Sequence, residues 1–181
     1  MGELPIITLE RLVLRPFTLD DAKLIQKYAG DKEIAKMTLN IPHPYEDGMA
    51  EEWINTHFDD YNNGKSLTLA ITNKKEKYLI GAIGLRLNKK YEHAELGYWI
   101  GKKYWNNGYC TEAAKGIIKY GFNEMNLNRI YASHLKKNPA SGRVMEKVGM
   151  KYEGLFREHV KKWGDFQDLV YNGIIKKDHI D

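Results

Sequence analysis

The sequence has one cysteine, no long apolar run and no strong excess of either charge. Cys110, alone in 181 residues, cannot form an internal disulfide and is typical of a reducing compartment. No apolar run approaches the roughly 20 residues of a membrane span. The start, Met1 to Ile6, lacks an apolar targeting core. We therefore expect a cytoplasmic protein without membrane contact.

The charged residues and histidines give no sign of a nucleic-acid or metal site. Lysine and arginine number 28 against 24 acidic residues, so the net charge is only +4. A dedicated nucleic-acid-binding protein concentrates more positive charge, so we expect no direct binding of this kind. The six histidines are scattered, without the spacing that would put two on one helix face or strand. We expect no metal.

The chain has the size and composition of one well-packed α/β domain spanning residues 1–181. It is 43% hydrophobic and 12% aromatic, with no internal repeat or linker. Hydrophobic periodicity and turn residues predict about seven strands and four helices in a mixed sheet. The predicted strands cover 11–15, 67–72, 80–87, 93–100, 129–135, 150–160 and 168–175, and the predicted helices 21–28, 50–61, about 111–125 and 139–148.

Local signals support several of these boundaries. Thr18 to Asp21 matches a capping box, which places a helix start near Asp21. Asn138 and Pro139 are typical of a helix N-terminus, and Gly149 of a helix end. The turns between the strands at 67–100 are short and polar, which indicates an antiparallel meander.

The segment YWNNGYCTEAA, Tyr104 to Ala114, joins the end of a strand to the start of a helix. The first turn of a helix has unpaired N–H groups and the positive end of the helix dipole, so it stabilises an anion such as phosphate. Gly108 allows close approach, and Asn106 and Asn107 tolerate positive φ. The segment therefore indicates a pyrophosphate site, although it is also compatible with a simple turn.

Two longer stretches carry a family resemblance. ELGYWIGKKYWNNGYCTEAAKGIIKYGF and RIYASHLKKNPASGRVMEKVGMKYEG, with ERLVLRPFTLDDA near the start, resemble the RimJ/RimL-like branch of the GNAT superfamily of N-acetyltransferases. The resemblance implies acetyl-CoA as donor and a strongly twisted mixed sheet with helices on both faces. It also implies that the central strands splay at the cofactor site.

The resemblance assigns a set of cofactor-binding residues. The family's pyrophosphate loop falls on Trp105 to Cys110, where Trp105, Asn106 and Cys110 depart from the usual pattern. Binding through main-chain N–H groups tolerates such changes. The expected cofactor contacts are Trp99, Ile100, Trp105, Asn106, Asn107, Gly108, Tyr109, Cys110, Thr111, Asn138 and Ser141.

Glu95 and Ser141 are the catalytic candidates. In the strand 93–100 Glu95 shares a face with Gly97 and Trp99, just ahead of the cofactor loop. The resemblance makes Glu95 the base for the attacking amine, and Ser141 the proton donor for the departing thiolate. Glu95 is alternatively a solvent-facing or salt-bridged residue, Ser141 a small residue of a first turn, and water can supply the proton. Cys110 as a covalent nucleophile is not needed for direct transfer.

The expected reaction is direct acetyl transfer to a primary amine, foremost the N-terminal α-amine of a ribosomal protein. A small amine, such as a polyamine or aminoglycoside, is an alternative acceptor, and an acidic cleft would favour it. A non-catalytic acetyl-CoA-binding module is another alternative. The acceptor site is expected between residues 31–45 and the last strands. A homodimer is left open.

Overall fold

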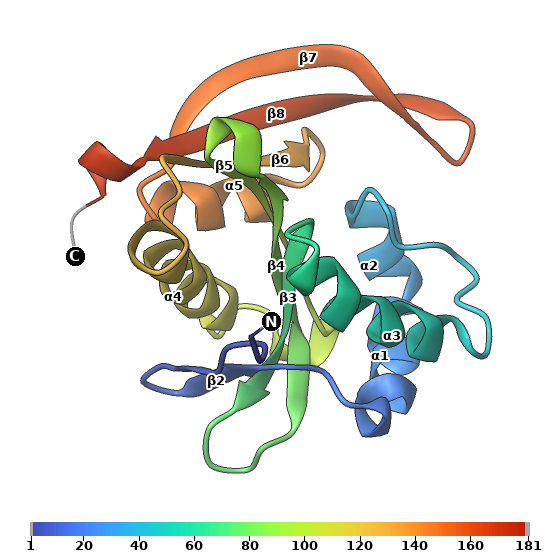
Figure 1. Cartoon of the computed structure of the whole chain (residues 1–181). Helices are drawn as coiled ribbons and strands as arrows, with labels where there is room; N and C mark the ends of the chain where they lie inside the picture. Colours follow the sequence, from blue (N-terminus) through green and yellow to red (C-terminus); the bar gives the residue numbers. More distant parts are fainter. Residues whose placement is uncertain (1, 180–181) are drawn as a thin grey trace.

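The strands form one sheet with helices on either side of it (Figure 1). The computed structural model describes residues 2–179, so the ends of the predicted 1–181 domain lie outside it. The strands are β1 (Ile7–Thr8), β2 (Leu12–Arg15), β3 (Ser66–Asn73), β4 (Leu79–Asn88), β5 (His93–Ile100), β6 (Arg129–Leu135), β7 (Lys151–Lys162) and β8 (Asp165–Ile175). The α-helices are α1 (Ala22–Ala29), α2 (Lys32–Met37), α3 (Met49–Asn62), α4 (Tyr109–Asn123) and α5 (Pro139–Lys147).

The sheet order is β1-β2-β3-β4-β5-β6-β8-β7, and every neighbouring pair is antiparallel except β5 and β6. The predicted meander is therefore confirmed for β3, β4 and β5. The parallel pair follows from the crossover through α4, because two parallel neighbours need a long connection. The predicted mixed sheet is likewise confirmed.

Two layers of helices cover the sheet. Helices α1 and α3 pack on one face, and α4 and α5 on the other, which agrees with their separation in Figure 1. The apolar residues of α4 repeat at helical spacing, so they form one buried stripe against the sheet: Ala114, Ile117, Ile118, Gly121 and Phe122. The core on the α1–α3 side is smaller and includes Phe17, Ile25 and Ile54.

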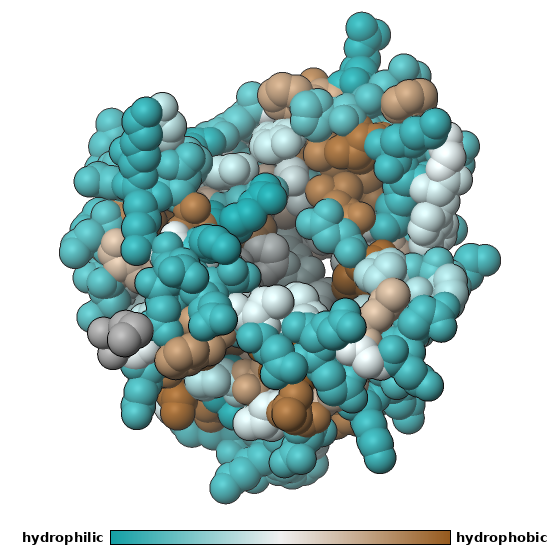
Figure 2. All heavy atoms as spheres, turned by 45° about the vertical axis from the view of Figure 1, so that its right-hand side comes forward, coloured by the Kyte–Doolittle hydropathy of each residue, from teal (hydrophilic) through white to brown (hydrophobic). Residues whose placement is uncertain are grey.

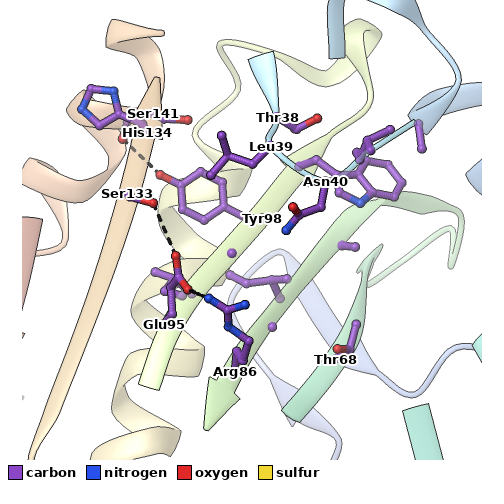
Figure 3. A pocket seen from close by; sticks show the side chains of 18 of the residues that line it. Thr38, Leu39, Asn40, Thr68, Arg86, Glu95, Tyr98, Ser133, His134 and Ser141 are labelled. Atoms are coloured by element: carbon purple, nitrogen blue, oxygen red, sulfur yellow. Dashed lines mark hydrogen bonds and ion pairs between the residues drawn. The ribbon is translucent and has the colours of Figure 1, made fainter. Parts of the chain in front are cut away.

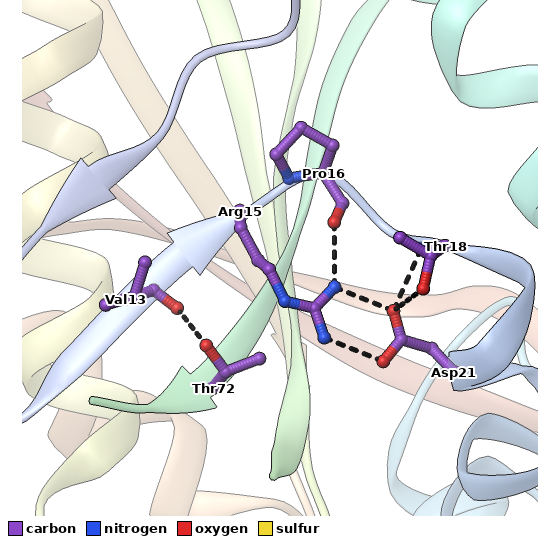
Figure 4. Close-up of polar contacts among 6 residues, drawn as sticks. All are labelled: Val13, Arg15, Pro16, Thr18, Asp21 and Thr72. Carbon is purple, nitrogen blue, oxygen red and sulfur yellow. Dashed lines mark hydrogen bonds and ion pairs between the residues drawn. The ribbon is translucent and has the colours of Figure 1, made fainter. Parts of the chain in front are cut away.

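An ion pair between the half-buried Arg15 and the buried Asp21 fixes the corner between β2 and α1 (Figure 4). Arg15 donates from Nη1 and Nη2 to the two carboxylate oxygens of Asp21, at 2.8 Å each. Asp21 also accepts from the main-chain N–H of Thr18 at 2.9 Å, as the capping signal predicts. The helix begins one residue later than expected, because Leu19–Asp21 forms a 3-10 turn. This corner holds the helices α1 and α2 beside the sheet.

Two elements were not predicted from the sequence. The six-residue helix α2 falls where no element is predicted, and β1 makes the sheet eight-stranded instead of seven-stranded. Both are too short to show a periodic pattern. No helix among residues 2–179 is long and apolar enough to cross a bilayer.

Candidate functional site

The central strands separate after Glu95. Strands β5 and β6 pair only at His93–Arg129, Ala94–Ile130 and Glu95–Tyr131. Beyond this point β5 continues to Ile100 along β4, while β6 continues to Leu135 along β8. The edge of β5 from Leu96 to Ile100 therefore has no strand partner on its β6 side. The splay implied by the resemblance is confirmed.

The loop after β5 turns sharply into α4. Asn106 and Gly108 have positive φ values of 63° and 76°, so both positions use residues that accept this conformation. Glu112 N–H donates to the carbonyl of Gly108 at 3.0 Å, which is the first bond of the helical ladder. The N–H groups of Tyr109, Cys110 and Thr111 precede that bond and have no intrahelical acceptor. The loop therefore presents main-chain donors at the positive end of α4.

Side chains hold the loop in this shape. The indole Nε1 of Trp105 donates to the carbonyl of Ile100 at 2.8 Å, and Asn107 Nδ2 donates to the carbonyls of Tyr104 and Trp105 at 3.1 and 3.0 Å. A residue missed by the sequence reading, Arg11, braces the loop from outside. Its Nε donates to Glu112 Oε2 at 2.7 Å and its Nη1 to the carbonyl of Asn107 at 3.0 Å.

A cavity of about 490 Å³, the loop pocket, opens where the loop, the end of β5 and the start of α5 meet. Ten of the eleven expected cofactor residues line it, from Trp99 to Ser141. Asn107 is the exception, because its side chain is turned back onto its own loop. Three lysine and arginine side chains, Lys137, Arg143 and Lys147, also line this pocket. The amides of α4 and these cations suit an anionic ligand.

A larger cavity of about 880 Å³, the sheet groove, lies on the α1–α3 face of the sheet. Figure 2 brings this side forward and shows the surface hollowed near its centre. The groove is lined by residues 37–42, by strands β4 and β5, and by His159 and Tyr171 of the last strands. It therefore lies in the region where the acceptor site is expected. It shares five residues with the loop pocket: Met37, Thr38, Tyr98, Trp99 and Ser141. We call this shared region the junction.

Glu95 faces the groove at the point where β5 and β6 part (Figure 3). Its carboxylate forms an ion pair with Arg86, the directly opposite residue of β4, and accepts a bond of 3.4 Å from Ser133 Oγ. The charge of Glu95 raises the pKa of Arg86. The side chain of Glu95 is 19% exposed and that of Arg86 is 74% exposed. The carboxylate is therefore sheltered, whereas its partner reaches into solvent.

Ser141 is positioned by two polar neighbours at the junction. Asn138 Nδ2 donates to Ser141 Oγ at 3.1 Å and to the carbonyl of Met37 at 3.2 Å. Asn138 Oδ1 accepts from the N–H of Ser141 at 3.3 Å, as expected of an N-cap residue. Because its oxygen already accepts a bond, the Ser141 hydroxyl can direct its proton into the junction.

Tyr98 closes the other side of the junction. Its hydroxyl donates to the main-chain carbonyl of Ser141 at 3.0 Å and so joins β5 to α5 (Figure 3). Burial strongly raises the pKa of Tyr98, so this phenol stays protonated and keeps the bond at neutral pH. This contact was not predicted, since the two residues are 43 positions apart.

Cys110 lies in the wall of the loop pocket. Burial raises the pKa of the Cys110 thiol, which disfavours the reactive thiolate despite its place at a helix N-terminus. The electrostatics therefore suit a packing residue better than a nucleophile. Among the described residues, no group of three or more His, Cys, Asp or Glu could hold a metal ion.

The chain matches known proteins over most of its length. Residues 11–151 match the Acetyltransferase (GNAT) domain family. The uncharacterized N-acetyltransferase YnaD of Bacillus subtilis is 34% identical over 175 residues, covering 95% of this chain and 98% of YnaD. The protein therefore belongs to the GNAT family of N-acetyltransferases.

A more distant relative and a solved structure are also similar to this chain. The [ribosomal protein uS5]-alanine N-acetyltransferase of Escherichia coli is 24% identical over 178 residues, covering 95% of this chain and 91% of that protein. The structure of RimL, a ribosomal L7/L12 α-N-protein acetyltransferase in complex with coenzyme A, has a TM-score of 0.87 at 15% identity, with 94% of this chain and 98% of RimL covered. At that identity, the likeness to RimL concerns the fold alone.

Proposed function

We propose that the protein transfers an acetyl group from acetyl-CoA directly to a primary amine, foremost the N-terminal α-amine of a ribosomal protein. The observation that carries this proposal is the meeting of two cavities at the junction, with Glu95 on the groove side and Ser141 between them. A donor in the loop pocket and an acceptor in the sheet groove would meet there. The relative that acetylates ribosomal protein uS5 supports this choice of acceptor.

The loop pocket suits acetyl-CoA. The pyrophosphate would bind to the N–H groups of Gly108 to Thr111, where the glycine leaves no Cβ in the way. Lys137, Arg143 and Lys147 would contact the outer phosphates, and Trp99, Ile100 and Asn138 the pantetheine arm. In this arrangement the thioester would point toward the junction.

Glu95 and Ser141 have separate roles in the proposed transfer. The amine nitrogen bonds to the thioester carbonyl carbon, and the carbon–sulfur bond breaks. Glu95 accepts the proton that the amine loses, directly or through one water, and Ser141 gives a proton to the departing thiolate. An α-amine of pKa ~7.8 costs only about 1 kcal/mol to deprotonate at pH 7, against ~4.6 kcal/mol for a lysine amine. One sheltered carboxylate therefore suffices for an α-amine.

The charge of the sheet groove favours a protein N-terminus over a polyamine. Its lining contains two carboxylates, Glu52 and Glu95, and Glu95 is already paired with Arg86. A polyamine carries several positive charges and needs several unpaired carboxylates along its length. The groove is therefore not the acidic cleft expected for such an acceptor.

Turnover tests this proposal. Purified protein is incubated with acetyl-CoA and a panel containing ribosomal-protein N-terminal peptides, polyamines and aminoglycosides. Release of CoA thiol is measured, and products are located by mass spectrometry. Acetylation at peptide α-amines is expected. Product only on small amines would select the alternative acceptor, and binding of acetyl-CoA without any product would select the non-catalytic module.

A further inference from the structure

Gly97 lies in the middle of β5, where neither backbone conformation nor packing requires a glycine. Its φ is outside the left-handed region, and a Cβ at this position would meet no atom within 4 Å. Its cross-strand neighbour Gly84 differs, because a Cβ there would lie 2.8 Å from the carbonyl oxygen of Leu67. A glycine inside a strand weakens it, and often marks a place where a ligand approaches the backbone.

The open space above Gly97 belongs to the sheet groove. Glu95, Gly97 and Trp99 lie opposite Arg86, Gly84 and Ala82 of β4, so these six positions share one face of the sheet. Gly97 therefore leaves a stretch of main chain without a side chain between the Arg86–Glu95 ion pair and the Trp99 side chain. We call this stretch the floor of the groove. It lines the groove but not the loop pocket, whereas Trp99 lines both. An occupant of this floor touches both the candidate base and the junction.

The groove is larger than a compact amine requires. Its 880 Å³ extend from Trp53 of α3, across the floor, to His159 and Tyr171 of the β7–β8 hairpin. The uncharged polar side chains of Asn40, Thr68 and Ser133 line the same groove (Figure 3). Such groups satisfy the amide N–H and C=O groups of a main chain, as buried polar groups require.

We infer that Gly97 determines acceptor specificity, by leaving room for the main chain of an extended peptide whose N-terminal amine reaches Glu95. This inference rests on the proposed acetyl transfer and deepens it. A side chain at position 97 would occupy the volume of the peptide while leaving the donor site unchanged. A compact amine at the junction would reach Glu95 through one water and would have no main chain to lay over the floor.

Substitution of Gly97 tests the inference. Gly97→Ala and Gly97→Val are compared with the wild type on an unblocked N-terminal peptide and on glycinamide. Because added methyl groups are poorly tolerated in occupied space, Gly97→Val should lower kcat/KM for the peptide roughly tenfold or more, with Gly97→Ala between. For glycinamide the loss should stay within about threefold, and KM for acetyl-CoA within about twofold.

Gly154→Val is the matched control. Gly154 also lies in a strand with an ordinary φ, its Cβ would meet the Phe156 ring at 3.5 Å, and it lines neither cavity. Thermal unfolding checks that all variants fold. If Gly97→Val does not fold, the comparison of the two acceptors is made with Gly97→Ala. Unchanged peptide kinetics in the folded Gly97 variants, or equal losses on both acceptors, would overturn the inference.

The wild-type result separates this inference from the proposed function. If the wild type acetylates glycinamide but no peptide, the chain remains an amine acetyltransferase and the peptide floor is refuted. If the wild type releases no thiol with any amine, the proposed function itself fails, and the inference fails with it.

Discussion

Replacing Glu95 with glutamine removes the proposed base while keeping its shape. The glutamine oxygen can still accept from Ser133, and Arg86, being 74% exposed, becomes solvated when its partner loses charge. Exposed ion pairs contribute about 0–1 kcal/mol, so the free energy of unfolding should change little. Activity should fall much more, since general bases contribute roughly 10²- to 10⁴-fold.

The loss should depend on pH in a defined direction. For an α-amine of pKa ~7.8, the neutral fraction rises from about 2% at pH 6 to about 94% at pH 9. A base that removes the amine proton is therefore needed most at low pH. We expect the ratio of wild-type to Glu95→Gln kcat/KM to shrink by up to about 60-fold over this range.

The assay follows CoA thiol release from pH 6 to 9, with acetyl-CoA affinity measured separately by calorimetry. That affinity should be unchanged, because Glu95 does not line the loop pocket. Glu153→Gln is the control: Glu153 also pairs with an arginine, Arg129, but lies outside both cavities. Equal activity of wild type and Glu95→Gln at every pH would remove Glu95 from the mechanism, and a pH-independent loss would leave it only a positioning role.

Three further substitutions test the loop and the corner that positions the helices. Gly108→Val should weaken acetyl-CoA binding beyond calorimetric detection without unfolding the chain. The control is Gly48→Val, which should bind acetyl-CoA normally, because Gly48 is also an N-cap glycine of positive φ but lies outside both cavities. Retained affinity in Gly108→Val would contradict the phosphate site. Arg11→Ala should weaken acetyl-CoA binding by about 1 kcal/mol, because Asn107 of the loop and Glu112 of α4 lose their hydrogen bonds to the Arg11 side chain. Unchanged affinity would show that the loop holds its shape without Arg11. Asp21→Asn should cost roughly 2–4 kcal/mol of unfolding free energy at pH 7, measured by urea titration, because it leaves Arg15 without its counter-charge. Burial acts to raise the pKa of Asp21, but the bonds from Arg15 and Thr18 outweigh it and the pKa is lowered. This stability is therefore present above about pH 4 and is lost as pH falls through the folded pKa, so the two proteins should converge in acid, and a constant difference would refute the assignment.

The sequence predicted the parts of the fold that have a period or a cap. The strand 93–100 and the apolar stripe of α4 have clear repeats, and Asn138 with Gly149 marks both ends of α5. Helix α2 and strand β1 were missed because neither is long enough to repeat a pattern. Local sequence signals therefore predicted the three parts that form the loop pocket: the loop before α4, the strand β5 and the start of α5.

The supporting contacts of the site could not be predicted in the same way. Arg86 lies nine positions from Glu95, Ser133 lies 38 positions away, and Arg11 lies 101 positions from Glu112. Each of these pairs is formed by strand register or by packing between distant segments. A single sequence contains residue types at these positions but not the register that brings them together.

The opening between β5 and β6 links the fold to the proposed chemistry. Strand β6 pairs with β8 at seven positions and with β5 at only three, so β6 follows β8 away from β5 after Glu95. Main-chain N–H and C=O groups of Leu96 to Ile100 on that edge then lack a neighbouring strand, and buried groups of this kind need partners. The pantetheine arm of acetyl-CoA carries amides that can supply them. If the proposed function holds, the donor would complete the sheet where the strands part, and the same parting would open a passage through which an amine beside Glu95 reaches the thioester.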